Sequence, residues 1–441
     1  MGSTLRLIHG RVPAAFPAGV YYRNGPDLSD KLLAHPLDGQ GRIDRLEFSS
    51  SSVKLLSRRV ETPSVGRGCF GTGPQHGLAV HNPANTSVVH HAGRLMALWE
   101  GSRPIELDPH SLATLHEVPL GGAAAGLPAS SGWSALDRLV GAGGHAVSAH
   151  PVRDPATGRL VVLSSQILPT AVRCRISELQ PNTLAEERHR TFDVPGFTHV
   201  HGGLLVSKNL YVMFAPALAL ATADYLIGGR AMGACVSHKM ASTKLHIIPR
   251  DHAGAARVAT LPRCFVTHGI NAYEMAGSLV VDAMVAAKLP PMCGPLAALP
   301  DVRVRRFIVD LNTLHVAERT MYPGPVELPA INPEVVGTRH RFLYGSVASG
   351  GWAKLDAATG RTRIVCCAKG PHMEPTFVPR VFGGEEEDAG WLLGFALVQG
   401  RPVLCIADAK SMTPCCVLDA PGANVLGIHG TFVHSEYNHE P

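Results

Sequence analysis

Short runs of apolar residues recur along the whole chain, and each run is bounded by glycine, proline, aspartate or asparagine. The short length of these runs and their wealth of Val, Leu, Ile and aromatic residues are typical of β-strands, while the spacing of an amphipathic helix is scarce. The pattern therefore predicts an all-β fold. Examples are RLMALWE (94–100), RLVVLSSQI (159–167), NLYVMF (209–214), SLVVDAMV (278–285) and RFLYGSV (341–347).

A weak internal repeat refines this prediction. The turn string Asp-x-x-Thr/Ser-Leu/Gly starts at Asp108, Asp154, Asp310 and Asp356, and a looser copy starts at Asp408. Several of these starts are separated by about 50 residues or a multiple of it, which is the length of a four-stranded propeller blade. Each Asp is expected to cap its own turn through its side chain. The alternative is a set of ordinary hairpin turns without a global period.

Two segments interrupt the strand pattern, and no linker divides the chain. Residues 215–234 and 283–300 are rich in Ala, Leu and Pro and carry few charges. We expect them to form a small helical or irregular cap over one face, with apolar surface exposed. The whole chain, residues 1–441 with these two segments included, is expected to form one propeller domain.

Composition excludes several classes of function. With 45% apolar and 17% charged residues, the chain can bury a large core. A net charge of +5, no Lys/Arg block and only 6% aromatic residues argue against nucleic-acid binding. The ten cysteines show no CxxC spacing, so we expect reduced thiols and an intracellular location, either cytoplasm or plastid. No secretory signal and no membrane-spanning segment are expected.

Four histidines stand in apolar or turn contexts where strands begin or end. They are His150 in SAHPVRDP, His201 in THVHGG, His268 in FVTHGIN and His429 in GIHGTFV. A propeller brings such positions together at its axis, so these imidazoles are candidate ligands of one metal ion. Imidazole suits Zn, Cu, Ni and Fe, and the ligand type alone does not name the metal. His199 points to the same side of a strand as His201 and is its rival.

Three glutamates lie in similar contexts: Glu100 in ALWEG, Glu327 in VELPAIN and Glu374 in HMEPTFV. Carboxylates beside metal-bound histidines accept the far ring N–H, which fixes the tautomer and strengthens the ligand. The alternative for each glutamate is a surface position or a local cap.

Nine motifs follow one another along nearly the whole chain: GVYYRNGPDLSD, HNPANTSVVHHAGRLMALWEG, IELDPHSL, SAHPVRDPATG, FVTHGINAYE, VELPAINP, MEPTFVPR, EEDAGWLL and GIHGTFV. In this order they resemble the carotenoid cleavage oxygenase family. The resemblance implies a seven-bladed β-propeller with a helical cap, and a non-haem Fe(II) held by four histidines, three of them braced by glutamates.

Carried over to this chain, the resemblance implies an iron site made of four histidine ligands and three glutamates that hold them. Family members usually follow the second ligand with an acidic or small polar residue and a bulky one, whereas here Gly202 and Gly203 follow. This departure keeps the choice between His201 and His199 open. His90, His91, His145, His372 and His434 are off the matching positions. The implied ligands are His150, His201, His268 and His429, braced by Glu100, Glu327 and Glu374.

The resemblance also implies the reaction, which is oxidative cleavage of a conjugated double bond of a carotenoid or apocarotenoid by dioxygen to two carbonyl products. Members that cleave stilbenoids usually carry Lys directly before the first glutamate, and here Trp99 stands there as a candidate residue of the substrate tunnel. Stilbenoid cleavage and a metal-free propeller that only binds partners are the alternatives. We expect a peripheral membrane surface as a partner, and neither nucleic acid nor another protein.

Overall fold

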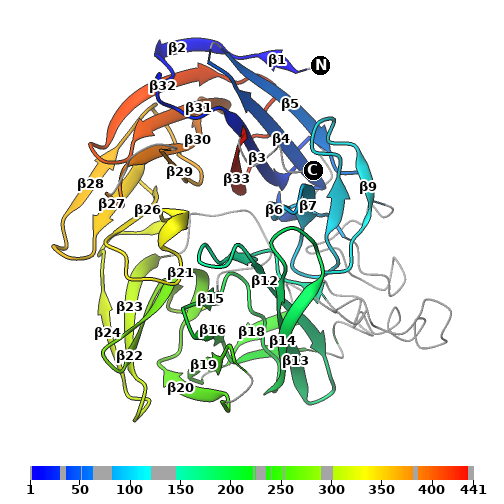
Figure 1. Cartoon of the computed structure of the whole chain (residues 1–441), viewed down its shortest axis with the longest axis vertical. Helices are drawn as coiled ribbons and strands as arrows, with labels where there is room; N and C mark the ends of the chain where they lie inside the picture. Colours follow the sequence, from blue (N-terminus) through cyan, green and yellow to red (C-terminus); the bar gives the residue numbers. More distant parts are fainter. Residues whose placement is uncertain are drawn as a thin grey trace.

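Seven antiparallel sheets of four or five strands form a ring around a central axis in the computed structural model (Figure 1). Each sheet is one blade, in which short apolar strands joined by tight turns pair with their neighbours. The seven-bladed β-propeller expected from the resemblance is therefore confirmed. The structure describes residues 2–29, 36–50, 52–62, 82–120, 146–221, 224, 235–239, 241–251, 254–289, 301–380 and 386–435.

The first three blades in the ring contain the N-terminal strands and the last strand of the chain. The first consists of β1 (Ser3–Thr4), β5 (Val53–Arg59), β4 (Gly41–Phe48), β3 (Gly19–Pro26) and β33 (His429–His434). The second consists of β6 (Ser87–His91), β7 (Arg94–Leu98), β8 (Ile105–Leu107) and β9 (Thr114–Glu117). The third consists of β10 (Ala146–Val147), β11 (Val152–Arg153), β12 (Leu160–Ile167), β13 (Ala171–Leu179) and β14 (Glu186–Pro195).

The other four blades follow the chain in order. They are β15 (Leu204–Val206), β16 (Leu210–Ala215), β19 (Thr243–Pro249) and β20 (Arg257–Leu261); then β21 (Phe265–Met275), β22 (Ser278–Ala286), β23 (Val302–Asp310) and β24 (Val316–Thr320). Next come β25 (Val326–Ala330), β26 (Phe342–Val347), β27 (Trp352–Asp356) and β28 (Thr362–Val365). The last holds β29 (Thr376–Pro379), β30 (Gly390–Val398), β31 (Arg401–Asp408), β32 (Thr413–Asp419) and β2 (Arg6–Gly10).

The ring is closed at two places by strands from opposite ends of the chain. β33 pairs antiparallel with β3 in the first blade, and β2 pairs antiparallel with β32 in the last. A buried ion pair supports this closure, because Arg23 on β3 lies 2.7 Å from Asp44 on β4. Asp44 also accepts the backbone N–H of Asn424, which lies in the connection that leads to β33. The closure therefore depends on pairing of side chains as well as on backbone hydrogen bonds.

The core lies between neighbouring blades rather than in a single centre. Phe214 on β16 and Phe307 on β23, for example, belong to one buried apolar cluster that joins two blades. Because each inner blade face is covered by the next blade, most strands read as continuous apolar runs, which is why the sequence pattern was so clear.

The described parts of the two segments that were expected to form a helical or irregular cap contain β-strands. Residues 218–220 form a strand, β17 (Leu218–Leu220), which pairs with β18 (Val236–His238), and residues 283–286 are the end of β22. The remaining residues, 222–234 apart from 224 and 290–300, lie outside the described residues. The described part of the chain includes two short 3₁₀ turns, η1 (Pro36–Asp38) and η3 (Pro333–Val335). Local pairing of Leu218 with His238 overrides the helix propensity of an Ala-rich segment.

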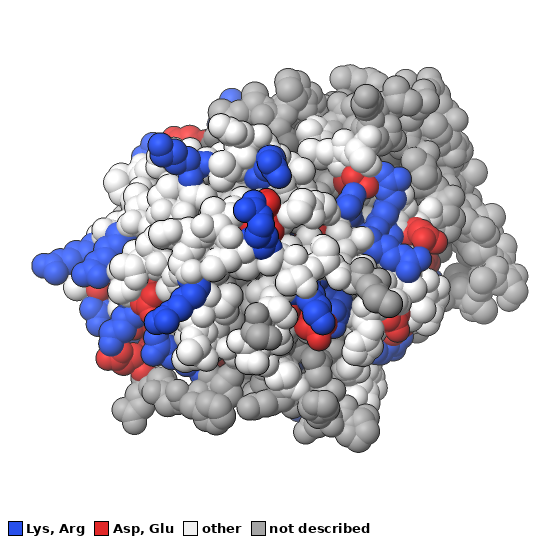
Figure 2. All heavy atoms as spheres, turned by 90° about the horizontal axis from the view of Figure 1, so that it is seen from above, with Lys and Arg blue, Asp and Glu red and all other residues white. Residues whose placement is uncertain are grey.

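The described surface mixes both signs of charge. Figure 2 shows Lys and Arg side chains scattered over one face, several of them beside Asp or Glu, with uncharged surface between them. Within the described part of the chain, no helix has the length and apolar character that a membrane crossing requires.

Candidate metal centre

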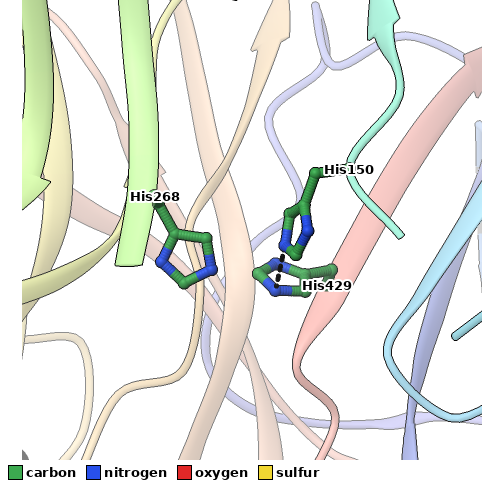
Figure 3. A group of neighbouring side chains, drawn as sticks. All are labelled: His150, His268 and His429. Atoms are coloured by element: carbon green, nitrogen blue, oxygen red, sulfur yellow. Dashed lines mark hydrogen bonds between the residues drawn. The ribbon is translucent and has the colours of Figure 1, made fainter. Parts of the chain in front are cut away.

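Four histidine side chains from four different blades meet inside the ring. His150 follows β10, His201 precedes β15, His268 lies within β21, and His429 is the first residue of β33. The ring centroid of His150 lies 4.4 Å from that of His201, 5.1 Å from that of His268 and 4.8 Å from that of His429. Figure 3 shows His150, His268 and His429 turned toward one another. All four histidines named by the resemblance are therefore brought together.

Each of the four imidazoles also contacts a glutamate on its other side. His268 Nδ1 lies 2.7 Å from Glu327 on β25, and His429 Nδ1 lies 2.7 Å from Glu374, just before β29. Glu100, which follows β7, places Oε1 at 3.0 Å from both His150 Nδ1 and His201 Nδ1. The resemblance implies three braced histidines, whereas here Glu100 serves two, so that all four imidazoles lie against a carboxylate.

The ring nitrogens that face the centre fit a bound cation. Because each Nδ1–H is donated to a carboxylate, each Nε2 carries a lone pair. His268 Nε2 is buried and has no hydrogen-bond partner in the described structure. His150 Nε2 and His429 Nε2 lie only 3.2 Å apart, an unfavourable approach of two lone pairs unless a positive charge lies beside them (Figure 3). The donor set therefore fits a metal ion.

The charge of the site supports the same conclusion. The side chains of Glu100, Glu327 and Glu374 are at most 14% exposed. Burial alone would raise the pKa of Glu327, but His268 and the backbone N–H of Leu328 lower it to about 2. Burial likewise raises the pKa of Glu100, but its contacts with His201 and His150 lower it more, so that this pKa is held well below the usual value. Ionised carboxylates this deeply buried require nearby positive charge.

Two of the imidazoles at the centre, those of His150 and His268, are held in the neutral form that a metal ligand requires. Burial lowers the pKa of His268, and it lowers that of His150 well below the usual range, since in both cases desolvation outweighs the neighbouring glutamate. His201 differs: burial lowers its pKa, but the charge of Glu100, the hydrogen bond to Glu100 and the charge of Glu327 together raise it above the usual value.

The structure distinguishes His201 from His199 by position. The ring centroid of His201 is 5.1 Å from that of His268, within the group of four, whereas the ring of His199 lies 6.5 Å from that of His201. His199 Nε2 is 3.9 Å from Glu100 Oε2, whereas His150 and His201 contact Oε1. A small cavity beside Glu100 is lined by Thr198, His199 and other residues, but not by His201.

Gly202 is a residue of the site that the sequence reasoning treated only as a departure from the family pattern. It forms a parallel bridge with His268, and its carbonyl oxygen accepts the N–H of Gly269 at 2.6 Å. A Cβ at position 202 would lie 2.7 Å from the carbonyl oxygen of Thr267 and 3.0 Å from the His268 ring. The chain can therefore pass beside His268 only with glycine here. The glycine that directly follows His201 in the sequence is the signal that could have identified this position.

The backbone bends where His268 and Glu327 stand. The β21–β22 register shifts on both sides of His268, between Val266 and His268 and between Gly269 and Asn271. The register of β25 shifts directly after Glu327. β-bulges of this kind re-aim a side chain, and they occur next to functional sites. Here they turn two side chains of neighbouring blades toward each other, and they are not visible in the strand pattern of the sequence.

Trp99 is buried, with 8% exposure. Its six-membered ring lies against Gly101, where an added Cβ would come within 2.5 Å of it. Trp99 does not line the cavity beside Glu100. Its role in a substrate tunnel stays a prediction.

Comparison with known proteins places this geometry in context. Residues 2–434 match the family described as retinal pigment epithelial membrane protein. The chain is 30% identical to the apocarotenoid-15,15'-oxygenase of Synechocystis sp., over 92% of this chain and 88% of that protein. It is 26% identical to a chloroplastic 9-cis-epoxycarotenoid dioxygenase of Oryza sativa, over 97% of this chain and 72% of that protein.

The fold is likewise similar to that of a solved structure. The crystal structure of cobalt-substituted Synechocystis apocarotenoid oxygenase superposes with a TM-score of 0.86 at 25% identity, and the match covers 99% of this chain and 96% of that chain. The similarity thus extends over all seven blades and is not confined to the motifs.

Proposed function

Since the chain belongs to the retinal pigment epithelial membrane protein family, whose members include the carotenoid cleavage oxygenases, we propose that it is an iron-dependent dioxygenase that cleaves a carbon–carbon double bond of a carotenoid or apocarotenoid. The products are aldehydes or ketones. The observation that carries the proposal is the group of four imidazoles, each held by a buried carboxylate, at the centre of the ring.

In this proposal His150, His201, His268 and His429 hold Fe(II) through their Nε2 atoms. Four neutral ligands leave the iron its full charge and at least one free position. When bound, iron supplies the electron transfer that allows dioxygen to react with a double bond. The protein residues contribute by position: Glu100, Glu327 and Glu374 fix the tautomer of the imidazoles and balance the charge, and the closely packed blades keep water from the centre.

The experiment that tests the iron site is a metal analysis of the purified protein and of three variants. Wild-type protein should contain about one iron per chain, the number that a single four-ligand site holds. His150→Ala, His268→Ala and His429→Ala should each lose both iron and cleavage, because each removes a ligand. Full iron occupancy in any of them would contradict the assignment.

A paired substitution decides the second ligand. His201→Ala should abolish iron binding, while His199→Ala should retain it, because only His201 lies within the group of four rings. The reverse result would assign the ligand to His199.

The proposed substrate is a polyene rather than a hydroxylated stilbene. Holding and activating a phenol requires a cationic or hydrogen-bonding group beside the iron, and the indole of Trp99 offers one neutral N–H in the position where a lysine would be needed. The two curated relatives named above act on carotenoids or apocarotenoids by name. Parallel assays with an apocarotenal and with resveratrol test this choice, and cleavage of resveratrol alone would overturn it while leaving the iron site unaffected.

We further propose that the enzyme is intracellular, in cytoplasm or plastid, and takes its substrate from a membrane surface through the cap segments. The beginning of the first segment lies next to the ligand loop, because Leu218 forms a bridge with Phe197 and Thr198 donates to the carbonyl of Pro216 at 2.8 Å. The second segment is tied to β18, the strand that pairs with the first segment, since the N–H of Leu289 is donated to His238 Nδ1 at 3.0 Å. Apolar segments beside the site favour a route that spares a polyene contact with water.

A further inference from the structure

A second group of metal-binding side chains lies between the last two blades, away from the four histidines. Cys367 is in the connection after β28, His372 is in the loop before β29, and Cys405 is in β31. Their ligand atoms all lie within 4.8 Å of one another. His372 and Cys405 are 5% and 0% exposed, whereas Cys367 is partly exposed and offers an access route.

The ring of His372 is already held in one orientation. Its Nδ1 lies 3.0 Å from the carbonyl oxygen of Gly370, and the indole of Trp352 packs edge-on against it at 5.2 Å between centroids. Nδ1 also accepts the backbone N–H of Gly351 at 3.0 Å, and Nε2 accepts the backbone N–H of Cys367 at 3.3 Å. A metal ion at Nε2 would take the place of the Cys367 N–H, and the ring would then donate Nδ1–H to the Gly370 carbonyl, as metal-binding histidines do to backbone carbonyls.

We propose that Cys367, His372 and Cys405 form a zinc site that is separate from the four-histidine centre. Two cysteines and one histidine are a known protein ligand set for zinc, with a fourth position left for water. Two thiolates and a neutral imidazole balance the charge of Zn²⁺, so that the ion can be buried without an uncompensated charge. Thiolate ligands also disfavour the hard ions that prefer oxygen.

The contact between the two sulfurs shifts the pKa values of the two thiols in opposite directions. A hydrogen bond from Cys405, opposed by burial and assisted by His372, lowers the pKa of Cys367 to about 6. The pKa of Cys405 is raised well above its usual value, first by the neighbouring Cys367 and then by burial. Binding of zinc displaces the Cys405 proton to solvent, which leaves both sulfurs as ligands.

Cys366 supplies a matched control within the same loop. It is exposed, and its Sγ donates to the carbonyl oxygen of Ala368 at 3.0 Å. Neighbours on an extended chain point to opposite sides, so Cys366 and Cys367 face different surroundings. The three proposed ligands come from two blades and show no CxxC spacing, which explains why the sequence did not reveal the site.

The test is zinc binding by the full-length protein, purified with reductant, depleted with a chelator and titrated with Zn²⁺. Metal is counted by mass spectrometry alongside iron. Cys367→Ser and His372→Gln should each bind about one zinc fewer per chain than wild type, because a site with two ligands left is weak. Iron content should not change in either variant, and Cys366→Ser should behave as wild type.

A second measurement separates this site from zinc taken up by the four histidines. Co²⁺ bound by thiolates gives a strong thiolate-to-cobalt charge-transfer absorption in the near ultraviolet, which an all-histidine site lacks. Wild type and Cys366→Ser should show this band, while Cys367→Ser should not. Absence of the band in wild type, or equal zinc uptake in wild type and Cys367→Ser, would overturn the proposal. So would a Cys367–Cys405 disulfide in protein that binds no zinc after reduction.

Discussion

At the scale of single residues, the candidate metal centre depends on how one carboxylate can serve two imidazoles. Glu100 Oε1 lies 3.0 Å from both His150 Nδ1 and His201 Nδ1, while Glu327 and Glu374 each hold one ring. A carboxylate accepts several N–H groups at once, whereas an amide has one acceptor oxygen and a competing NH₂ group.

Replacement of the glutamates should therefore weaken iron binding unequally. Glu327→Gln and Glu374→Gln should each reduce iron affinity or turnover by about 10–100-fold with the fold retained, since Gln keeps the volume but loses the anionic acceptor. Glu100→Gln should have the largest effect, because it affects two ligands. The measurement is iron affinity by competition with a chelator, with exposed Glu117→Gln as control. Wild-type affinity in all three variants would exclude a role for these carboxylates.

Gly202→Ala should disturb the centre without touching a ligand. The new Cβ would lie 2.7 Å from the Thr267 carbonyl oxygen and 3.0 Å from the His268 ring, so the backbone beside His268 must shift. We expect reduced iron content and a lower melting temperature. Gly203→Ala is the matched control, because its Cβ would meet only Phe214 and Val200, the nearest atom 3.3 Å away. If Gly202→Ala is no worse than Gly203→Ala, the close approach of the chain at 202 is unimportant.

At the scale of elements, the sequence predicted the strands and most of the turns, but not the place of every turn in a blade. Asp108, Asp310, Asp356 and Asp408 each connect the last two chain-consecutive strands of one blade, and each side chain accepts backbone N–H groups of its own turn. Asp154 instead joins β11 to β12 and is bound by Arg250 at 2.6 Å. Its spacing resembled the repeat by coincidence, because turn chemistry is local and carries no information about position in a blade.

The ligands of the candidate site could be predicted because their motifs are local in the sequence. The contacts between those ligands could not be predicted, because they depend on how the strands pair. The motifs around His150, His268 and His429 are contiguous, whereas the sharing of Glu100 by two imidazoles and the bulges of β21 arise only from the register between strands. The choice between His199 and His201 depends on the approach of Gly202 to His268, a contact of two blades.

The cap segments allow a test of membrane contact. Leu289, partly exposed and bonded to His238, should contribute to liposome association, because burial of a leucine in the membrane interface is favourable by about 1.5–3 kcal/mol. Leu289→Asp should reduce association in a co-sedimentation assay and leave iron content unchanged. Leu115→Asp is the matched control, since Leu115 on β9 is 53% exposed and lies outside the cap segments. If wild-type protein ignores liposomes, the proposal of membrane contact is wrong. Leu296, in the second segment, lies outside the described residues.

At the scale of the whole molecule, closure of the ring rests on a few buried polar groups. Asp44 is 0% exposed and holds Arg23 at 2.7 Å together with the backbone N–H of Asn424. These contacts join the first blade to the end of the chain.

Asp44→Asn should destabilise the protein by about 3–5 kcal/mol, because it leaves the Arg23 guanidinium buried without a counter-charge. Urea denaturation measures this loss. Asp301→Asn is the control: its pair with Arg303 is exposed, at 64% and 39% of the two side chains, and pairs of this kind contribute at most about 1 kcal/mol. Equal stability of the two variants would show that the buried pair does not support closure.

The strand that closes the ring is also the one that brings the fourth imidazole. His429 is the first residue of β33, whereas the strands next to His150, His201 and His268 all precede it in the chain. A ribosome therefore makes the other three histidines and all three glutamates first, and the growing chain carries an incomplete centre until β33 has been synthesised and has paired with β3. Delivery of the proposed iron should accordingly follow translation, and nascent chains arrested before residue 429 should acquire no stably bound iron.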